Sequence, residues 1–297
     1  MKRQTASFLI ERFDAAGIRP DSRRGQNFLV DLNLVALLAR SARLDQRDVI
    51  LEVGTGTGSL TAMLASQAAH VVTVEVDTRL HAMAQETLGP FSNITFLRQD
   101  VLKNKNRIDA NVKEAIVAAL EADPERRFKL VANLPYNIAT PILSNLLAAP
   151  PRPALMVATI QKELADRIVA RPNTKDYGAL SIWMQSQCDV EIVRVLPPSV
   201  FWPRPKVHSA IVRIRPVANK WQRISDLPFF QETVRALFFH RRKYLRSVVQ
   251  SAFKGRLDKA EVDRLLEECG FQGTERAEQL SVEQMIGFCE TARRRLS

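Results

Sequence analysis

The chain has 297 residues, of which 46% are hydrophobic, so it can bury a substantial core, and its length suggests about two domains. Lysine and arginine total 43 against 32 aspartates and glutamates, and the formal net charge of +11 favours a polyanionic partner, nucleic acid before an anionic membrane. Three widely spaced cysteines and four scattered histidines argue against a disulfide framework and a structural zinc site, so we expect a reducing compartment and no metal.

The N-terminal segment opens with charged residues, and Glu11 and Arg12 interrupt its apolar stretch, so it lacks the apolar core of a signal peptide. No window approaches the ~18 uninterrupted apolar residues that a membrane span requires, which predicts a soluble, cytoplasmic protein. Apolar residues recur at helical spacing over 3–17 and 31–43. The polar, basic stretch RPDSRRGQNFLVD separates these two predicted helices.

Strand-like and helix-like segments then alternate along the chain. Strands are predicted at 48–53, 70–77, 94–100, 127–132, 154–161, 189–196 and 208–216, with a charged, weakly organised segment after the third. This alternation predicts an α/β fold with a doubly wound, mostly parallel sheet that helices cover on both faces. The Pro-rich LPPSVFWPRPK between the last two strands predicts an antiparallel end of the sheet.

The pattern changes after Pro216, because every periodic segment from about 227 onward is helical. The longest of these helical segments reads QETVRALFFHRRKYLRSVVQSA. We therefore expect two domains. Residues 1–217 would form the α/β domain with its helical and basic N-terminal segment, and residues 218–297 a small all-helical domain.

A glycine-rich turn follows the first strand and places Gly54, Gly56 and Gly58 before a helix. Glycines let a ligand approach the backbone closely, although NAD-binding folds also use such a turn. Glu75 ends the second strand, where a carboxylate can accept hydrogen bonds from both ribose hydroxyls of a nucleoside cofactor. Asp100 ends the third strand, where an acid can accept from an exocyclic adenine amine. These strand ends predict an adenosine site, and both NAD and S-adenosylmethionine remain open as cofactors.

The sequence NLPY at 133–136 follows the apolar run KLVA. Pro135 cannot donate to a strand ladder, so the chain is expected to leave the sheet at Asn133. If the target is an adenine amine, the side-chain oxygen of Asn133 and the carbonyl of Pro135 can hold its two hydrogens and turn its lone pair toward an electrophile. Tyr136 offers a face on which a base can stack. The alternative is a plain turn before a helix, because Asn and Pro are common turn residues.

Five sequence blocks, in the same order, resemble the ribosomal RNA adenine N6-dimethyltransferase family. The blocks are RRGQNFLVD, VANLPYNIATPIL, IQKELADRIVARPNTKDYGALS, PPSVFWPRPKVHSAIVRI and FFHRRKYLRSVV. They span nearly the whole chain. The resemblance implies a Rossmann-like class I methyltransferase that uses S-adenosyl-L-methionine. It further implies that N6 of two adjacent adenosines near the 3′ end of small-subunit (16S) ribosomal RNA is dimethylated during late subunit assembly.

The same resemblance assigns residue roles by position. The implied cofactor contacts are Asn27, Leu29, Gly54, Glu75, Asp100 and Asn133, of which Asn27 and Leu29 rest on the resemblance alone. Asn133, Pro135 and Tyr136 are the implied catalytic residues that hold the target adenine. Phe201 is a second predicted stacking face, with a core aromatic as the alternative. The expected partner is an assembly intermediate of the small ribosomal subunit, bound by a monomer without metal or membrane.

Two departures from the family pattern stand out. Thr55 lies in the glycine turn where the family usually has proline. The connection from Asp100 to Asn133 is longer than usual and carries the basic sequence KNKNR at 103–107. Neither removes a proposed chemical group, but the long connection affects the rim of the cofactor pocket.

A basic segment follows in the helical part, where seven lysines and arginines and no acid lie between Arg235 and Arg256. Such charges contact phosphates and position RNA. The predicted RNA-binding residues are Arg23, Arg24, Arg241, Arg242, Lys243 and Arg246, with Lys175 on the same surface. The alternative is a solvated charged face.

Three other functions stay open. Methylation of large-subunit ribosomal RNA is disfavoured by the long resemblance in the C-terminal blocks. A non-catalytic RNA-binding or assembly factor is disfavoured because Glu75, Asp100 and NLPY are intact. An NAD-dependent oxidoreductase is disfavoured because no candidate acid or base for hydride transfer lies near the strand ends.

Overall fold

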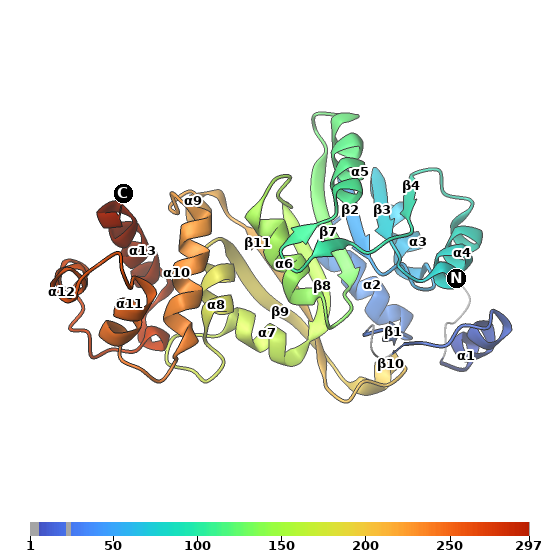
Figure 1. The fold of residues 1–297 in the computed structure, drawn as a ribbon. Coiled ribbons are helices and arrows are strands. Elements are labelled where there is room, and N and C mark those ends of the chain that lie inside the picture. The colour runs from blue at the N-terminus through green and yellow to red at the C-terminus, as the bar shows by residue number, and fades with distance from the viewer. Residues whose placement is uncertain (1–5, 22–24, 297) are drawn as a thin grey trace. The chain divides into compact units, whose positions relative to one another are not determined.

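The computed structural model describes residues 6–21 and 25–296, and these group into two compact units (Figure 1). The first unit comprises the described residues up to 165 together with 191–215. The second comprises 166–190 and the described residues from 216 onward. The predicted division after residue 217 differs from this grouping in one respect, because residues 166–190 group with the C-terminal helices.

The first unit is built on a seven-stranded sheet with the order β4-β3-β2-β7-β8-β11-β9. The strands are β2 (Asp48–Val53), β3 (His70–Val74), β4 (Ile94–Leu97), β7 (Arg127–Asn133), β8 (Leu155–Gln161), β9 (Cys188–Leu196) and β11 (Ser209–Pro216). Strands β4, β3, β2, β7 and β8 are parallel, and β11 is antiparallel to β8. The predicted α/β fold, with a mostly parallel sheet and an antiparallel end, is confirmed.

Helices α2 (Leu32–Ser41), α3 (Ser59–Ala65), α4 (Thr78–Leu88), α5 (Ala110–Glu121) and α6 (Ala139–Ala148) cover this sheet. Helix α1 (Ala6–Ala15) instead packs through Phe13 with Leu80 and Met83 of α4. Side chains of α2 and α3 pack with Ile50 of β2 and Val71 of β3 in one apolar cluster. Successive side chains of a strand point to opposite faces, and Val49 and Leu51 are also fully buried, so both faces of β2 are covered.

Two short pairings were not foreseen from the sequence. Strand β1 (Phe28–Leu29) pairs antiparallel with β10 (Phe201–Trp202), just after the 3₁₀ turn Pro198–Val200. The segment expected to be weakly organised instead forms a hairpin of β5 (Leu102–Asn104) and β6 (Arg107–Ile108). Two- and three-residue strands are too short to show an alternating pattern.

The second unit is helical. Helix α7 (Lys162–Val169) begins in the first unit, and the others are α8 (Ala179–Gln185), α9 (Ala218–Trp221), α10 (Leu227–Phe239), α11 (Leu245–Ala252), α12 (Lys259–Glu268) and α13 (Val282–Leu296), with a 3₁₀ turn at Ala277–Gln279. Helix α10 contacts α8, α11 and α13. The single helical segment predicted for QETVRALFFHRRKYLRSVVQSA is wrong in one detail, because α10 ends at Phe239 and α11 begins only at Leu245. Within the described ranges, no helix combines the length and apolarity needed to cross a membrane.

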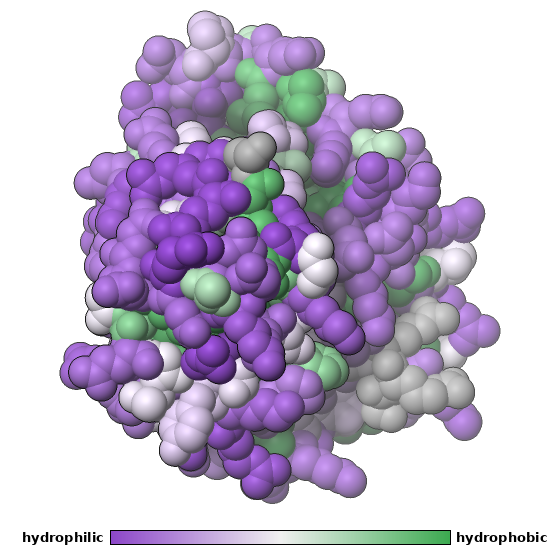
Figure 2. Space-filling view, turned by 60° about the vertical axis from the view of Figure 1, so that its left-hand side comes forward, coloured by the Kyte–Doolittle hydropathy of each residue, from purple (hydrophilic) through white to green (hydrophobic). Residues whose placement is uncertain are grey.

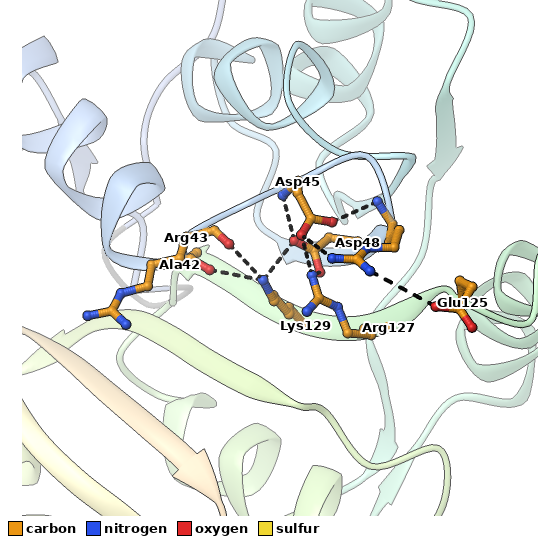
Figure 3. A network of polar contacts seen from close by, with 8 residues as sticks. Ala42, Arg43, Asp45, Asp48, Glu125, Arg127 and Lys129 are labelled. Carbon is orange, nitrogen blue, oxygen red and sulfur yellow. Dashed lines mark hydrogen bonds and ion pairs between the residues drawn. The ribbon is translucent and has the colours of Figure 1, made fainter.

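A polar cluster lies at the amino-terminal end of β2 and β7 (Figure 3). Lys129 donates to the Oδ2 atom of Asp48 over 2.7 Å and to the backbone carbonyls of Ala42 and Arg43. Arg127 donates to Asp45 over 2.6 Å from the same strand. Asp48 is fully buried, so its charge depends on Lys129 and on Arg127, which lies 3.2 Å away.

Candidate active site

A cavity of about 290 Å³ opens at the carboxyl ends of β2, β3 and β7 in the first unit. Its lining includes all six predicted cofactor contacts, Asn27, Leu29, Gly54, Glu75, Asp100 and Asn133, and also Pro135. Carboxyl ends of parallel strands are where ligands bind in open α/β sheets. The structure thus brings these residues together, while their individual roles stay predictions.

The turn after β2 approaches the NLPY segment closely. Gly54 has a φ of 84°, in the left-handed region that glycine adopts at little cost, and its amide donates to the carbonyl of Val74 over 2.8 Å. A Cβ atom on Gly54 would lie 3.9 Å from the ring of Pro135. A Cβ atom on Gly56 would lie only 3.2 Å from the ring of Phe28. Side chains at these positions would occupy the space between the turn and the opposite wall.

Glu75 is held at the end of β3 by two backbone donors. Its Oε2 atom accepts from the amide of Gly56 over 3.1 Å, and its Oε1 atom accepts from the amide of Asp77 over 3.0 Å. Burial raises the pKa of this carboxyl group. Because each carboxylate oxygen can accept more than one hydrogen bond, Glu75 keeps acceptor capacity for hydroxyl donors in the cavity.

Glu52 is a further lining residue that the sequence did not single out as a site residue. Its Oε2 atom accepts from the hydroxyls of Thr61 and Thr73 over 2.6 and 2.7 Å, and Thr73 also pairs with Thr55 over 2.6 Å. Its Oε1 atom is buried and has no partner among the described residues. Burial raises the pKa of Glu52 to about 8. Thr55, where the family usually has proline, therefore joins the turn to this buried network.

Asn133 ends β7 with a fixed amide. Its Nδ2 atom donates to the backbone carbonyl of Asn27 over 2.8 Å, while its Oδ1 atom is buried without a partner among the described residues. The carbonyl of Pro135 accepts from the amide of Ile138 over 3.2 Å in a turn, and a carbonyl oxygen has a second lone pair. The connecting segment before β1 lies against this turn, because a Cβ atom on Gly25 would lie 3.0 Å from the backbone nitrogen of Tyr136.

Tyr136 is partly buried and does not itself line the cavity, although Pro135 and Asn137 on either side do. Its hydroxyl pairs with the hydroxyl of Ser209 over 2.5 Å, which fixes the ring. Asp100 is exposed at the rim, and its Oδ1 atom accepts from the amide of Leu102 over 2.8 Å.

The position of Phe201 does not support the predicted stacking role. Phe201 is only 3% exposed and belongs to the apolar cluster that also holds Leu29 and Val35. It lies there because β10 pairs with β1, which draws residue 201 inward opposite Leu29. A ring without an exposed face has none to offer a base, so the structure corrects this prediction in favour of a core aromatic.

Four of the predicted RNA-binding residues belong to the second unit and separate into two groups there. The surface on the side of the C-terminal helices is mostly hydrophilic (Figure 2). Arg241 pairs with Glu278 and donates to the carbonyls of Lys175 and Thr174, so it holds the helical unit together. Arg246 pairs with Asp263 over 2.6 Å.

Arg242 and Lys243 are exposed, without an ion pair among the described residues. Of the predicted set, these two fit a phosphate-binding role best. Arg23 and Arg24 lie outside the described residues.

The electrostatics of the cavity select among nucleoside cofactors. Glu75 and Asp100 line it, Glu52 holds its proton at neutral pH because burial raises its pKa to about 8, and none of the described lining residues is a lysine or arginine. Carboxylates without a nearby cation repel a pyrophosphate and attract a cation. A donor that carries a sulfonium, an ammonium and an adenosine fits this lining, because the carboxylates of Glu75 and Asp100 can accept hydrogen bonds from it.

Comparison with known proteins agrees with this geometry. The sequence profile described as "Ribosomal RNA adenine dimethylase" matches residues 19–292. Two proteins named "Ribosomal RNA small subunit methyltransferase A", from Halothermothrix orenii and Pediococcus pentosaceus, are 37% and 40% identical to this chain. Each match spans 90% of this chain, and the matches span 86% and 87% of the two relatives, respectively.

Two solved structures are also similar. A dimethyladenosine transferase from Plasmodium falciparum has a TM-score of 0.74 at 22% identity, covering 89% of this chain and 96% of that chain, and shows the shared fold. The 23S rRNA methyltransferase ErmE has a TM-score of 0.64 at 26% identity, covering 89% of this chain and 98% of that chain. With the profile matched over most of the sequence and close relatives along nearly its full length, the chain belongs to the ribosomal RNA adenine dimethylase family.

Proposed function

We propose that this enzyme dimethylates N6 of two adjacent adenosines near the 3′ end of small-subunit ribosomal RNA, on a late assembly intermediate in the cytoplasm. The methyl donor is S-adenosyl-L-methionine. The observation that carries the proposal is the buried, unpartnered Oδ1 atom of Asn133, a residue that lines the cavity together with Pro135. A buried acceptor without a partner is costly to the free protein, and a bound amine would satisfy it.

The donor site uses residues from four segments. Glu75 would accept from the ribose hydroxyls, Asp100 from the adenine amine of the donor, and the turn at Gly54 would lie against its aminocarboxypropyl chain. Asn27 and Leu29 would close the site from the connecting segment, which the bond from Asn133 to the Asn27 carbonyl holds in place. When bound, S-adenosyl-L-methionine supplies an electrophilic methyl group on a sulfonium.

Two oxygen atoms would orient the target amine. The lone pair of an adenine N6 is delocalised into the ring, so the nitrogen is a poor nucleophile. The Oδ1 atom of Asn133 and the carbonyl of Pro135 would accept hydrogen bonds from its two N–H groups, favour a pyramidal nitrogen whose lone pair is less delocalised, and direct that lone pair toward the donor. Formation of the N–C bond leaves the nitrogen cationic, and it releases one proton to solvent. The neutral product keeps a single N–H group, so one acceptor still positions the nitrogen for the second transfer. Such positioning supplies a large part of the rate enhancement in reactions of this kind.

Tyr136 would hold the base by stacking, which contributes ~1–3 kcal/mol per base. The ring is suited to this because its hydroxyl is paired with Ser209 and its orientation is therefore fixed. An adenine within structured RNA must be unstacked before it can reach the cavity. The exposed cations Arg242 and Lys243 of the second unit would contact phosphates of the same particle.

The choice of small-subunit RNA is supported by the names of the relatives at 37% and 40% identity, against 26% for the 23S rRNA methyltransferase ErmE. Small ribosomal particles that lack the modification would be incubated with a methyl-labelled donor, and the labelled nucleotides mapped. Label as N6,N6-dimethyladenosine at two adjacent small-subunit positions is expected. Label in large-subunit RNA instead would overturn the substrate while leaving the chemistry intact.

A pair of matched variants tests the residue roles. Asn133→Ala should lower turnover by orders of magnitude and leave affinity for the particle nearly unchanged, because Asn133 lies in the cavity. Asn219→Ala, which changes an exposed asparagine on α9 outside the cavity, should behave like the unaltered enzyme. If Asn133→Ala retains full turnover, the assigned role of its amide is wrong.

A further inference from the structure

The hairpin of β5 and β6 is an exposed basic arm whose purpose the catalytic site does not explain. All five residues from Lys103 to Arg107 are exposed, three of them are cations, and no acid lies between Val101 and Ile108. The side chains of Lys103, Lys105 and Arg107 form no ion pair or hydrogen bond with the described residues. Some other cations of this unit, such as Arg47, Arg127 and Lys129, are held in ion pairs, whereas the hairpin groups three without one within five residues.

The arm is ordered at both ends and at its tip. Val101 and Ile108 are buried, and the amide of Asp109 donates to the carbonyl of Val101 over 2.9 Å. At the tip, the Oδ1 atom of Asn104 accepts from the amide of Asn106 over 2.9 Å. The three cations are therefore presented from a fixed backbone, which lowers the entropy lost when they bind a partner.

The arm is connected both to the cavity and to the helix that follows the NLPY turn. On one side, Asp100 and Val101 line the cavity and lead directly into β5. On the other side, β6 packs against α6, and the Nδ2 atom of Asn145 on that helix donates to the carbonyl of Lys105 over 3.2 Å. Asn145 lies six positions after Ala139, where α6 begins, which is about 9 Å along a helix from the end of the NLPY turn.

From this placement we propose that the hairpin at 102–108 binds phosphates of the RNA strand that flanks the target adenosine. The inference rests on the proposed function, because it takes RNA as the partner. Lysine and arginine side chains suit phosphate oxygens, and contacts of this kind fix the position of a strand without reading its sequence. The exposed asparagine Asn106 at the tip adds a neutral amide that can donate to the same backbone.

The test replaces the three cations by Lys103→Ser, Lys105→Ser and Arg107→Ser together. The matched control is Arg40→Ser, Arg43→Ser and Arg194→Ser, which removes the same charge from exposed positions of the same unit outside the cavity and the arm. Binding is measured on unmodified small ribosomal particles, and on their protein-free RNA, across a salt series without turnover. Donor binding is measured separately by calorimetry, and kcat and KM for the particle by methyl incorporation.

We expect the log–log salt slope of the arm variant to fall by about 2, because each single-strand phosphate contact contributes about 0.7. We also expect a raised KM for the particle, a kcat within about twofold of the unaltered enzyme, and unchanged donor affinity. The control should keep most of its slope. Equal losses in both triple variants would overturn the inference, since only net charge would then matter.

A slope that falls on intact particles but not on protein-free RNA would also overturn the inference, by pointing to an acidic ribosomal protein as the partner. Failure of the proposed function is seen independently, as absence of methylation of the particle by the unaltered enzyme. The binding series still decides the partner of the arm in that case.

Discussion

Replacing Glu52 by glutamine should stabilise the free enzyme at neutral pH and above. In the folded protein this carboxyl is fully buried, its Oε2 atom accepts from two threonine hydroxyls, and its Oε1 atom has no partner among the described residues. Burial raises its pKa from an ordinary 4.5 to about 8. Glutamine keeps an oxygen for Thr61 and Thr73 and removes the ionisable proton.

The size of the effect follows from the two pKa values. The folded protein retains the proton up to about pH 8, whereas the unfolded chain releases it above 4.5. Stability from this group is therefore fully present below 4.5 and is lost as pH rises through about 8. Each pH unit in that window costs about 1.4 kcal/mol, so the penalty at neutral pH is on the order of 3 kcal/mol. The glutamine variant does not carry it.

The assay is urea unfolding without the methyl donor, at several pH values between 6 and 8. The unaltered enzyme should lose about 2–3 kcal/mol more unfolding free energy over this range than Glu52→Gln, while other titrating groups cancel in the comparison. Glu114→Gln, at an exposed position on α5, is the matched control and should follow the unaltered enzyme. Parallel pH curves for the enzyme and Glu52→Gln would refute the reasoning.

Three further predictions concern other parts of the molecule. Lys129→Met should lower the unfolding free energy by about 3–5 kcal/mol in urea titrations, because it leaves Asp48 buried without its closest cation; a loss below about 1 kcal/mol would mean that Arg127 alone suffices. Gly54→Ala should cost about 1–2 kcal/mol of stability, because its φ is 84°, and weaken donor binding in calorimetric titrations; an unchanged donor Kd would place the donor elsewhere. Arg242→Ala with Lys243→Ala should reduce the salt slope of particle binding by about 1.5, whereas an unchanged slope would mean that both side chains are only solvated.

Much of the fold follows from the sequence because apolar runs of strand length are unambiguous when helices alternate with them. The strand predicted at 48–53 agrees with the structure at both ends. The β1–β10 pair could not be foreseen, since two-residue strands carry no periodicity and their partners lie far apart in the chain.

The same pairing of β1 with β10 explains why Phe201 is buried. The sequence alone does not decide whether this residue lies in an exposed loop or in the core.

For the site, residues at strand ends were within reach of sequence reasoning, because Gly54, Glu75 and Asp100 each follow a recognisable strand. The second role of Asn133, as a donor to the Asn27 carbonyl, depends on a contact across 106 positions and is visible only in the structure. Likewise, Arg246 looks like a free cation in the sequence because Asp263, its partner, belongs to another helix.

Strand β7 is held near both of its ends by side-chain hydrogen bonds. Lys129 anchors it to Asp48 near the start, and Asn133 ties its last residue to Asn27, about 13 Å further along. Because both ends are fixed, the strand cannot slide against its neighbours, and the number of residues between Lys129 and Asn133 sets where the Asn133 amide lies at the edge of the sheet. Losing a single residue there would turn the asparagine to the opposite side of the sheet, out of the cavity. The spacing between Lys129 and Asn133 therefore matters as much as the identity of the two residues.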